Sequence, residues 1–149
     1  MEKHIMHTKN RIEKIYQDYS SVSENIENKW SKDFFYSLLL EKNIFFISFN
    51  NPLEGYLIGR KIIDEYEILS LATDIKKRRR GVGLGLMHKL LDMAKKEKIK
   101  RVILEVSKNN IAAINMYKKL GFKKVSIRKK YYRIGVSFLD AYLMEKYLN

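Results

Sequence analysis

The sequence contains no cysteine, one proline and three histidines among its 149 residues. The lack of cysteine excludes disulfide bonds, thiolate metal sites and a cysteine nucleophile. His4, His7 and His88 form no cluster with carboxylates of the kind that binds a metal, so we expect no metal site. A single proline leaves no proline-rich linker, and we expect residues 1–149 to form one domain.

Long hydrophobic runs are also missing. No stretch approaches the roughly 18 consecutive apolar residues of a membrane-spanning helix. The first ten residues, MEKHIMHTKN, lack the apolar segment of a secretory signal peptide. Hydrophobic residues make up 46% of the chain and charged residues 32%, which is typical of a globular protein. We therefore expect a cytoplasmic protein.

Negative charge is scarce in the second half of the chain. Residues 1–74 carry 9 Lys or Arg and 12 Asp or Glu, whereas residues 75–149 carry 21 and 5. The net charge of +13 therefore comes from the second half. A field of this sign attracts polyanions, such as a phosphorylated cofactor, RNA or a ribonucleoprotein, and disfavours a polycationic substrate.

The pattern of apolar residues predicts an α/β domain in which helices flank a mixed β-sheet. Helices are expected over residues 9–20, 29–42, 84–98 and 109–121, with Ser31 and Asn110 as N-caps. Strands are expected over residues 43–49, 56–62, 66–75, 101–107, 122–133 and 136–148. The first two strands should form a hairpin. The strand–helix–strand unit over 66–107 should be a parallel crossover.

A basic, glycine-rich turn, KKRRRGVGLGL, lies at residues 76–86 between a strand and a helix. Backbone N–H groups at such a junction bind phosphate. The dinucleotide pattern fails because Leu86 stands where a glycine is needed, and the Walker pattern is absent. The turn does match R-x-x-G-x-G, with Arg78, Gly81 and Gly83. A nucleic-acid patch and a solvated loop remain the alternatives.

A second motif lies downstream. The segment N-x-x-A-x-x-x-Y-x-x-x-G-F runs from Asn110 to Phe122. Together the two motifs resemble the GNAT family of N-acetyltransferases. Further segments are similar to the subgroup that acetylates the N-terminal alanine of ribosomal proteins: Leu104–Val106, R-x-x-Y-Y from Arg128, DAYLM from Asp140, and W-S-x-x-x-F from Trp30. The resemblance covers about residues 28–149.

The resemblance implies that acetyl-CoA is the acetyl donor. It places the pyrophosphate on the glycine turn, the pantetheine arm along the end of the preceding strand, and one hydrogen bond at the cap of the second helix. The implied set of cofactor-binding residues is Leu71, Ala72, Thr73, Arg78, Arg79, Arg80, Gly81, Val82, Gly83, Leu84 and Asn110.

Glu105 and Tyr117 are the catalytic residues that the resemblance implies. Glu105 interrupts an apolar strand, and it would act as the general base that removes a proton from the attacking amine. Tyr117 would protonate the leaving thiolate. The alternatives are a solvent-facing carboxylate on an edge strand and an aromatic core residue. With no cysteine available, the acetyl group would pass directly to the amine.

The implied acceptor is a protein N-terminus, most specifically the N-terminal alanine of a small-subunit ribosomal protein. Tyr131 and Tyr132 would line the peptide groove, with Trp30 either beside it or in the core. The basic second half would contact RNA or the ribosome. One alternative is an acetyltransferase for a small-molecule amine or an internal lysine. Another is a regulator that binds CoA or RNA without catalysis.

Overall fold

Six strands form one sheet in the order β1-β2-β3-β4-β6-β5. The computed structural model describes residues 9–23, 30–49, 53–77, 80–134 and 137–149. The strands are β1 (Ile44–Phe49), β2 (Gly55–Ile62), β3 (Glu65–Thr73), β4 (Arg101–Ser107), β5 (Lys123–Ile134) and β6 (Ser137–Tyr147). The helices are α1 (Lys9–Val22), α2 (Lys32–Leu39), α3 (Val82–Lys96) and α4 (Ile111–Lys119), with a short 3-10 helix, η1 (Ile75–Lys77). In these ranges, no helix combines the length and apolar character needed to cross a membrane.

The sheet is mixed, as the sequence predicts. β1 and β2 form the expected hairpin, and β3 runs antiparallel to β2. β3 and β4 are parallel and are joined through α3, which confirms the predicted crossover. β6 inserts between β4 and β5 and is antiparallel to both, so β5 is an edge strand.

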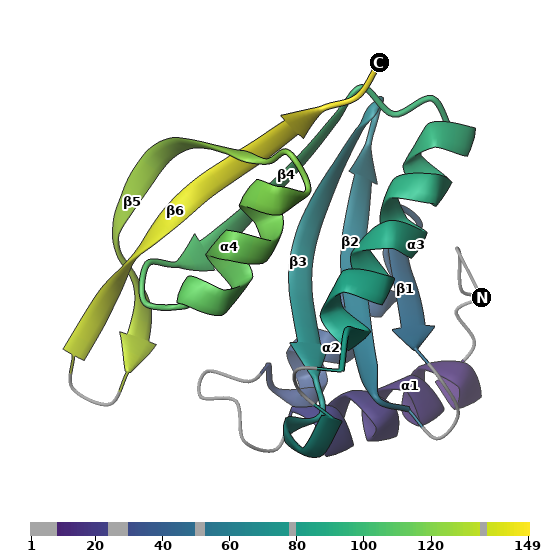
Figure 1. Cartoon of the computed structure of the whole chain (residues 1–149). Helices are drawn as coiled ribbons and strands as arrows, with labels where there is room; N and C mark the ends of the chain where they lie inside the picture. Colours follow the sequence, from purple (N-terminus) through teal and green to yellow (C-terminus); the bar gives the residue numbers. More distant parts are fainter. Residues whose placement is uncertain (1–8, 24–29, 50–52, 78–79, 135–136) are drawn as a thin grey trace.

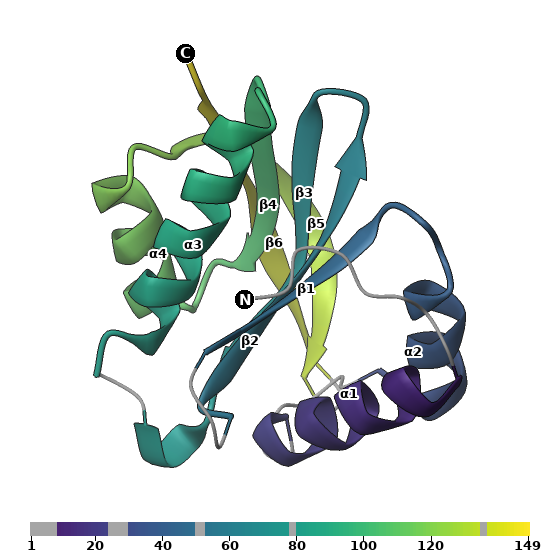
Figure 2. The same cartoon turned by 90° about the vertical axis from the view of Figure 1, so that its right-hand side faces the viewer.

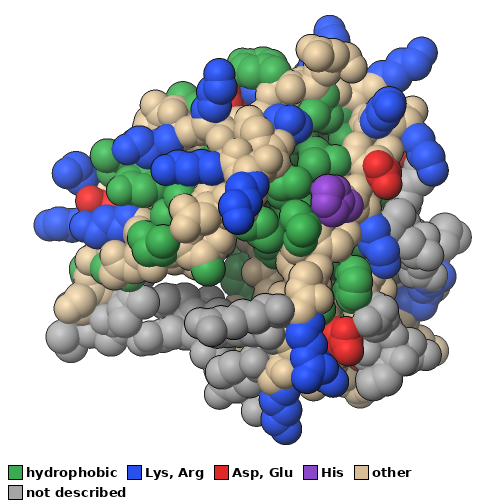
Figure 3. Space-filling model, in the orientation of Figure 1, with side chains coloured by type: hydrophobic (Ala, Val, Ile, Leu, Met, Phe, Trp, Pro, Cys, Tyr) green, Lys and Arg blue, Asp and Glu red, His purple; other side chains and the backbone are tan. Residues whose placement is uncertain are grey.

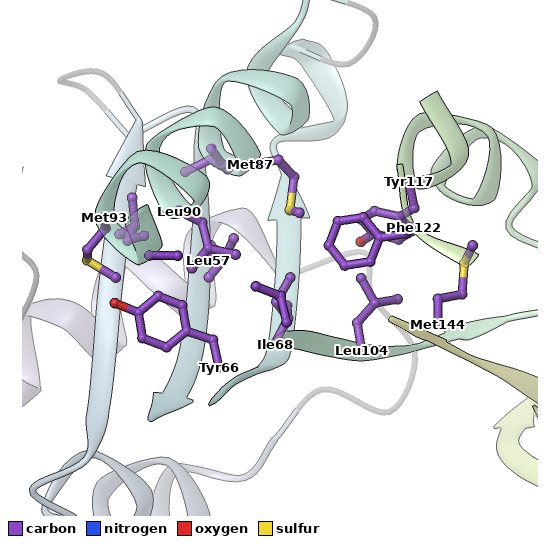
Figure 4. Packing of buried hydrophobic residues seen from close by; sticks show 14 of the residues in the cluster. Leu57, Tyr66, Ile68, Met87, Leu90, Met93, Leu104, Tyr117, Phe122 and Met144 are labelled. Atoms are coloured by element: carbon purple, nitrogen blue, oxygen red, sulfur yellow. The ribbon is translucent and has the colours of Figure 1, made fainter. Parts of the chain in front are cut away.

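The helices cover the two faces of the sheet in pairs (Figure 1). The turned view shows α3 and α4 on one side of the strands and α1 and α2 on the other (Figure 2). α3 buries one stripe of side chains, including Leu86, Leu90 and Met93, against the strands. Figure 4 shows this cluster continuing to Leu104 and Tyr117. A second cluster fills the face under α1 and α2.

The contact between β3 and β4 is short. Their pairing covers only four residue pairs and ends with Ile68 and Leu104, although both strands continue. At the same place Leu69 is skipped in the register between β3 and β2. Beyond this point β3 pairs with β2 alone, while β4 stays paired with β6 as far as Ser107. The two strands therefore enclose a wedge that opens toward the start of α3.

Candidate functional site

The N-terminus of α3 lies at the end of β3, where the sequence predicts a phosphate-binding turn. Gly81 is the N-cap, and its φ of 77° lies in the left-handed region that glycine adopts freely. Among the described residues, no side chain caps this helix. Its first N–H groups, which have no helical acceptor, are therefore available to an anion. Arg80 is exposed beside them, whereas Arg78 and Arg79 lie outside the described residues.

The next two glycines have different structural roles. A Cβ atom on Gly85 would lie 2.2 Å from Cε1 of Phe49, so Gly85 is required by packing against β1. A Cβ atom on Gly83 would lie 3.6 Å from Sδ of Met116 and 3.9 Å from Oγ1 of Thr73, which is ordinary contact. Gly83 therefore faces α4 and the end of β3. Packing among the described residues does not require a glycine at this position.

The predicted residues of β3 and α3 come together at the wedge. Leu71 is half-buried against the core under α3, and Ala72 is buried on the opposite face. Their backbone belongs to the part of β3 that lacks a partner strand on the β4 side. Val82 is buried at the start of α3, and Leu84 is partly exposed. Within the described part of the chain, a strand edge without a β4 partner thus adjoins a helix end that no side chain caps.

Glu105 lies on β4 at the wedge, one residue beyond the last β3–β4 pair. Its side chain is 26% exposed, and Nη1 of Arg128 donates to its two oxygens at 3.1 and 3.3 Å. β4 has neighbours on both sides. β4 is thus an inner strand of the sheet, but its pairing with β3 has ended at Glu105 and the carboxylate is partly exposed, so the solvent-facing alternative is not overturned. The carboxylate is held in place by an ion pair that reaches across β6 from β5.

A small cavity of about 80 Å³ lies beside Glu105 on the α1 and α2 side. Its lining includes Glu67 from β3 and Tyr131 from β5. The pKa of Tyr131 is raised, first by burial and then by the charges of Glu105 and Glu67, while Arg128 opposes the rise. The guanidinium carbon of Arg128 lies 4.0 Å from the centre of the Tyr131 ring. Sequence reasoning named Tyr131 but missed Glu67 and the ion pair of Arg128.

Tyr117 lies on the other face of the sheet from Glu105. It is 5% exposed and packs against Phe122, with the two rings 5.7 Å apart (Figure 4). The interpretation of Tyr117 as a core aromatic is thus correct as a description of its packing. Whether it also acts as an acid stays a prediction. Asn110 caps α4 by accepting a bond of 3.2 Å from the N–H of Ala113, as expected.

The described structure does not bring two residues predicted to line the peptide groove, Trp30 and Tyr132, to the cavity beside Glu105. The backbone N–H of Trp30 donates to the Tyr19 hydroxyl at 2.8 Å, and its ring stacks on Tyr19. Trp30 thus belongs to the aromatic cluster of α1 and α2 and does not line the cavity. Tyr132 pairs through its backbone with β6, and its side chain lies outside the described residues. Within those residues, no group of three possible metal ligands comes together.

Comparison with known proteins decides the family. The model of the acetyltransferase (GNAT) family matches residues 9–122, which is more than half of the chain. The chain belongs to the GNAT acetyltransferase family. The ribosomal protein bS18-alanine N-acetyltransferase of Escherichia coli strain K12 is 32% identical over 116 residues, covering 77% of this chain and 78% of that protein.

Solved structures agree with this assignment. The crystal structure of the ribosomal-protein-S18-alanine N-acetyltransferase from Escherichia coli matches with a TM-score of 0.81 at 25% identity, covering 97% of this chain and 92% of that one. An acetyltransferase from Bacillus anthracis, solved in complex with acetyl coenzyme A, matches with a TM-score of 0.63 at 24% identity. It covers 73% of this chain and 65% of that one, and it shares the fold. The six-stranded mixed sheet of this acetyltransferase is that of the family.

Proposed function

We propose that this acetyltransferase transfers the acetyl group of acetyl-CoA to the N-terminal amine of a protein. One observation carries the proposal. The carboxylate of Glu105 and the phenol of Tyr131 line one cavity at the wedge where β3 and β4 separate. Among the described residues, no side chain caps the end of α3 beyond the same wedge. The name of the Escherichia coli relative supports a ribosomal protein with an N-terminal alanine as acceptor.

Acetyl-CoA would bind along the wedge. Its pyrophosphate would accept hydrogen bonds from the backbone of residues 79–84 and attract the arginines at 78–80. The amide groups of its pantetheine arm would pair with the free edge of Leu71, Ala72 and Thr73, as an added strand would. A backbone N–H there would also stabilise the oxyanion of the thioester. Asn110 would add a side-chain contact while it caps α4.

Transfer would take place in one displacement. The α-amine has a reference pKa of about 7.7–8.0 and must lose a proton to attack. Glu105 would take that proton, directly or through a water molecule. The amine nitrogen would bond to the acetyl carbon as the C–S bond breaks. Tyr117 would give its proton to the leaving sulfur, and Tyr131 and Tyr132 would flank the incoming peptide.

The ribosome as partner is supported by the distribution of charge. Lys118 and Lys119 end α4, Lys123 and Lys124 begin β5, and Lys146 of β6 lies against the turn between them. Figure 3 shows lysine and arginine side chains gathered over this part of the molecule. Such a surface would bind the phosphates of ribosomal RNA while the site takes the protein N-terminus. This function would place the protein in the cytoplasm.

The test is acetyl transfer to peptides, measured by intact mass. Peptides that begin with Ala, Ser or Met are each compared with a blocked form and with free spermidine. We expect one acetyl group on the free Ala peptide. Glu105→Gln and Tyr117→Phe should each lower kcat/KM by about 100-fold or more. Glu41→Gln and Tyr36→Phe serve as matched controls on the surface and on α2.

Other outcomes separate the alternatives. Transfer to blocked peptides or to spermidine would point to an internal-lysine or small-molecule acetyltransferase. Binding of CoA without transfer to any acceptor would favour a regulator. Wild-type rates in both catalytic variants would remove Glu105 and Tyr117 from the mechanism, whatever the acceptor.

A further inference from the structure

β5 departs from regular pairing beside the candidate site. Arg128 and Tyr132 pair with residues of β6 that are only two positions apart, so residues 129–131 lie opposite Asp140 alone. Lys130, at the centre of this bulge, has a φ of 53°. A lysine rarely adopts this left-handed conformation unless its surroundings hold it there. Bulges of this kind bend a strand and redirect its side chains.

The bulge determines on which face of the sheet the side chain of Tyr131 lies. In a regular strand, residues three apart point to opposite faces of the sheet. Arg128 points to the face of Glu105, because the two side chains form an ion pair. A regular β5 would therefore turn Tyr131 away. Instead Tyr131 stacks on Arg128 at 4.0 Å and lines the same cavity as Glu105.

Asp140 makes the contact that holds this conformation. Its Oδ1 accepts a hydrogen bond of 3.0 Å from the backbone N–H of Lys130. Its own carbonyl accepts from the N–H of Lys108, in the turn after β4, at 3.0 Å. Asp140 thus ties the bulge of β5 to the end of the strand that carries Glu105.

The charges around Asp140 contribute less to this geometry. Nζ of Lys108 and Nζ of Lys129 lie 3.9 and 4.0 Å from Oδ2, and the side chain of Lys129 is 80% exposed. Ion pairs this long and this exposed contribute little to stability. The hydrogen bond to Lys130 has the ordinary length of 3.0 Å, and it acts on the residue with the unusual φ. The acceptor oxygen of Asp140, more than its charge, should therefore hold the bulge.

We propose that Asp140 is a positioning residue, which clamps the β5 bulge and so keeps Tyr131 and Arg128 beside Glu105. It touches neither substrate nor donor. Its effect on catalysis rests on the proposed function, but its effect on Tyr131 does not. Asp140 would thereby shape the acceptor side of the site and leave the acetyl-CoA side unchanged.

The test compares Asp140→Ala with Asp140→Asn, whose amide oxygen still accepts the Lys130 N–H. We expect Asp140→Ala to lower kcat/KM for the Ala peptide by roughly 10- to 100-fold through misplacement of the site, with KM for acetyl-CoA unchanged. Asp140→Asn should stay close to wild type. Asp64→Ala, which removes an exposed ion pair at the β2–β3 turn, is the matched control.

A second variant guards against a folding defect. Glycine at position 130 adopts positive φ without strain, so Lys130→Gly should restore part of the lost activity in the Asp140→Ala background. Activity close to wild type in Asp140→Ala would overturn the proposal. An equal loss in Asp140→Asn would overturn it as well, because charge would then matter more than the acceptor.

Tyr131 gives a readout that needs no activity. With tyrosine labelled at 13Cζ, its NMR signal is assigned by its loss in Tyr131→Phe. The chemical shift of this signal should change in Asp140→Ala and stay the same in Asp140→Asn and Asp64→Ala. If the wild type acetylates none of the peptides, the proposed function fails. The Tyr131 signal still tests whether Asp140 positions Tyr131. An unchanged chemical shift in Asp140→Ala would reject this positioning role.

Discussion

At the scale of single residues, Asp140 links pH to stability. The N–H of Lys130, followed by the charges of Lys108, Lys129 and Lys130, holds the pKa of Asp140 below its usual value. A depressed folded pKa contributes stability that is present above the unfolded pKa of about 3.9 and is lost as pH falls through the folded value. The carboxylate should therefore stabilise the fold at neutral pH and not in strong acid.

Asp140→Asn should reveal this dependence. Because the amide oxygen keeps the hydrogen bond to Lys130 and only the charge is lost, we expect the wild type to exceed the variant only slightly in free energy of unfolding at pH 7, with the difference shrinking as pH falls below about 3.9. Urea denaturation followed by circular dichroism at several pH values measures it. A difference that stays constant with pH would show that the charge of Asp140 does not contribute.

The sequence identified single residues better than it identified their partners. Glu105 stands out because it is a carboxylate in an apolar strand, and the family motif names it. Its ion pair with Arg128 joins residues 23 positions apart on strands that are separated by β6. Tyr131 lines the cavity beside a bulge in which Lys130 takes a positive φ. No periodicity in the sequence signals either feature.

At the scale of elements, the start of α3 combines packing with proposed donor binding. Gly85→Ala should lower the free energy of unfolding by about 1–3 kcal/mol, because its Cβ would overlap Phe49. Gly83→Ala should leave stability unchanged or slightly raised, since its Cβ meets only ordinary contacts. It should instead weaken acetyl-CoA binding.

Thermal unfolding and calorimetric titration with acetyl-CoA separate the two effects. Phe49→Leu in the Gly85→Ala background should recover part of the lost stability. If Gly83→Ala bound acetyl-CoA as tightly as the wild type, the donor would not approach α3 at this residue.

Element boundaries followed local signals. Helix α2 begins after Ser31, whose side chain accepts from the N–H of Phe34, and Gly121 ends the turn after α4 with a φ of 95°. α3 begins two residues earlier than expected, at Val82, because Gly81 itself serves as the N-cap. The sequence predicted every strand of the sheet. It did not predict the order β4-β6-β5, which depends on how the last two strands pair.

At the scale of the whole molecule, charge should govern binding to RNA. Reversal of Lys118, Lys119, Lys123 and Lys124 to Glu should weaken binding of an RNA hairpin. The slope of log K against log salt should become shallower by about 0.7–0.9 for each phosphate that the protein no longer neutralises. Fluorescence anisotropy over a salt series measures both effects.

The matched control reverses four other exposed lysines, Lys14, Lys42, Lys95 and Lys96. An equal loss of binding in both variants would mean that net charge alone attracts RNA, with no defined surface. Unchanged acetylation of a free peptide in both variants would show that the site is intact.

The short contact between β3 and β4 has a consequence for the integrity of the sheet. Four residue pairs are the whole strand pairing between a three-stranded half, β1-β2-β3, and another half, β4-β6-β5. A pantetheine arm lying in the wedge would supply the hydrogen bonds that a longer strand contact would otherwise make. The donor would then act as a seventh, removable strand. At 100 times its Kd it would add about 2.7 kcal/mol to the stability of the enzyme.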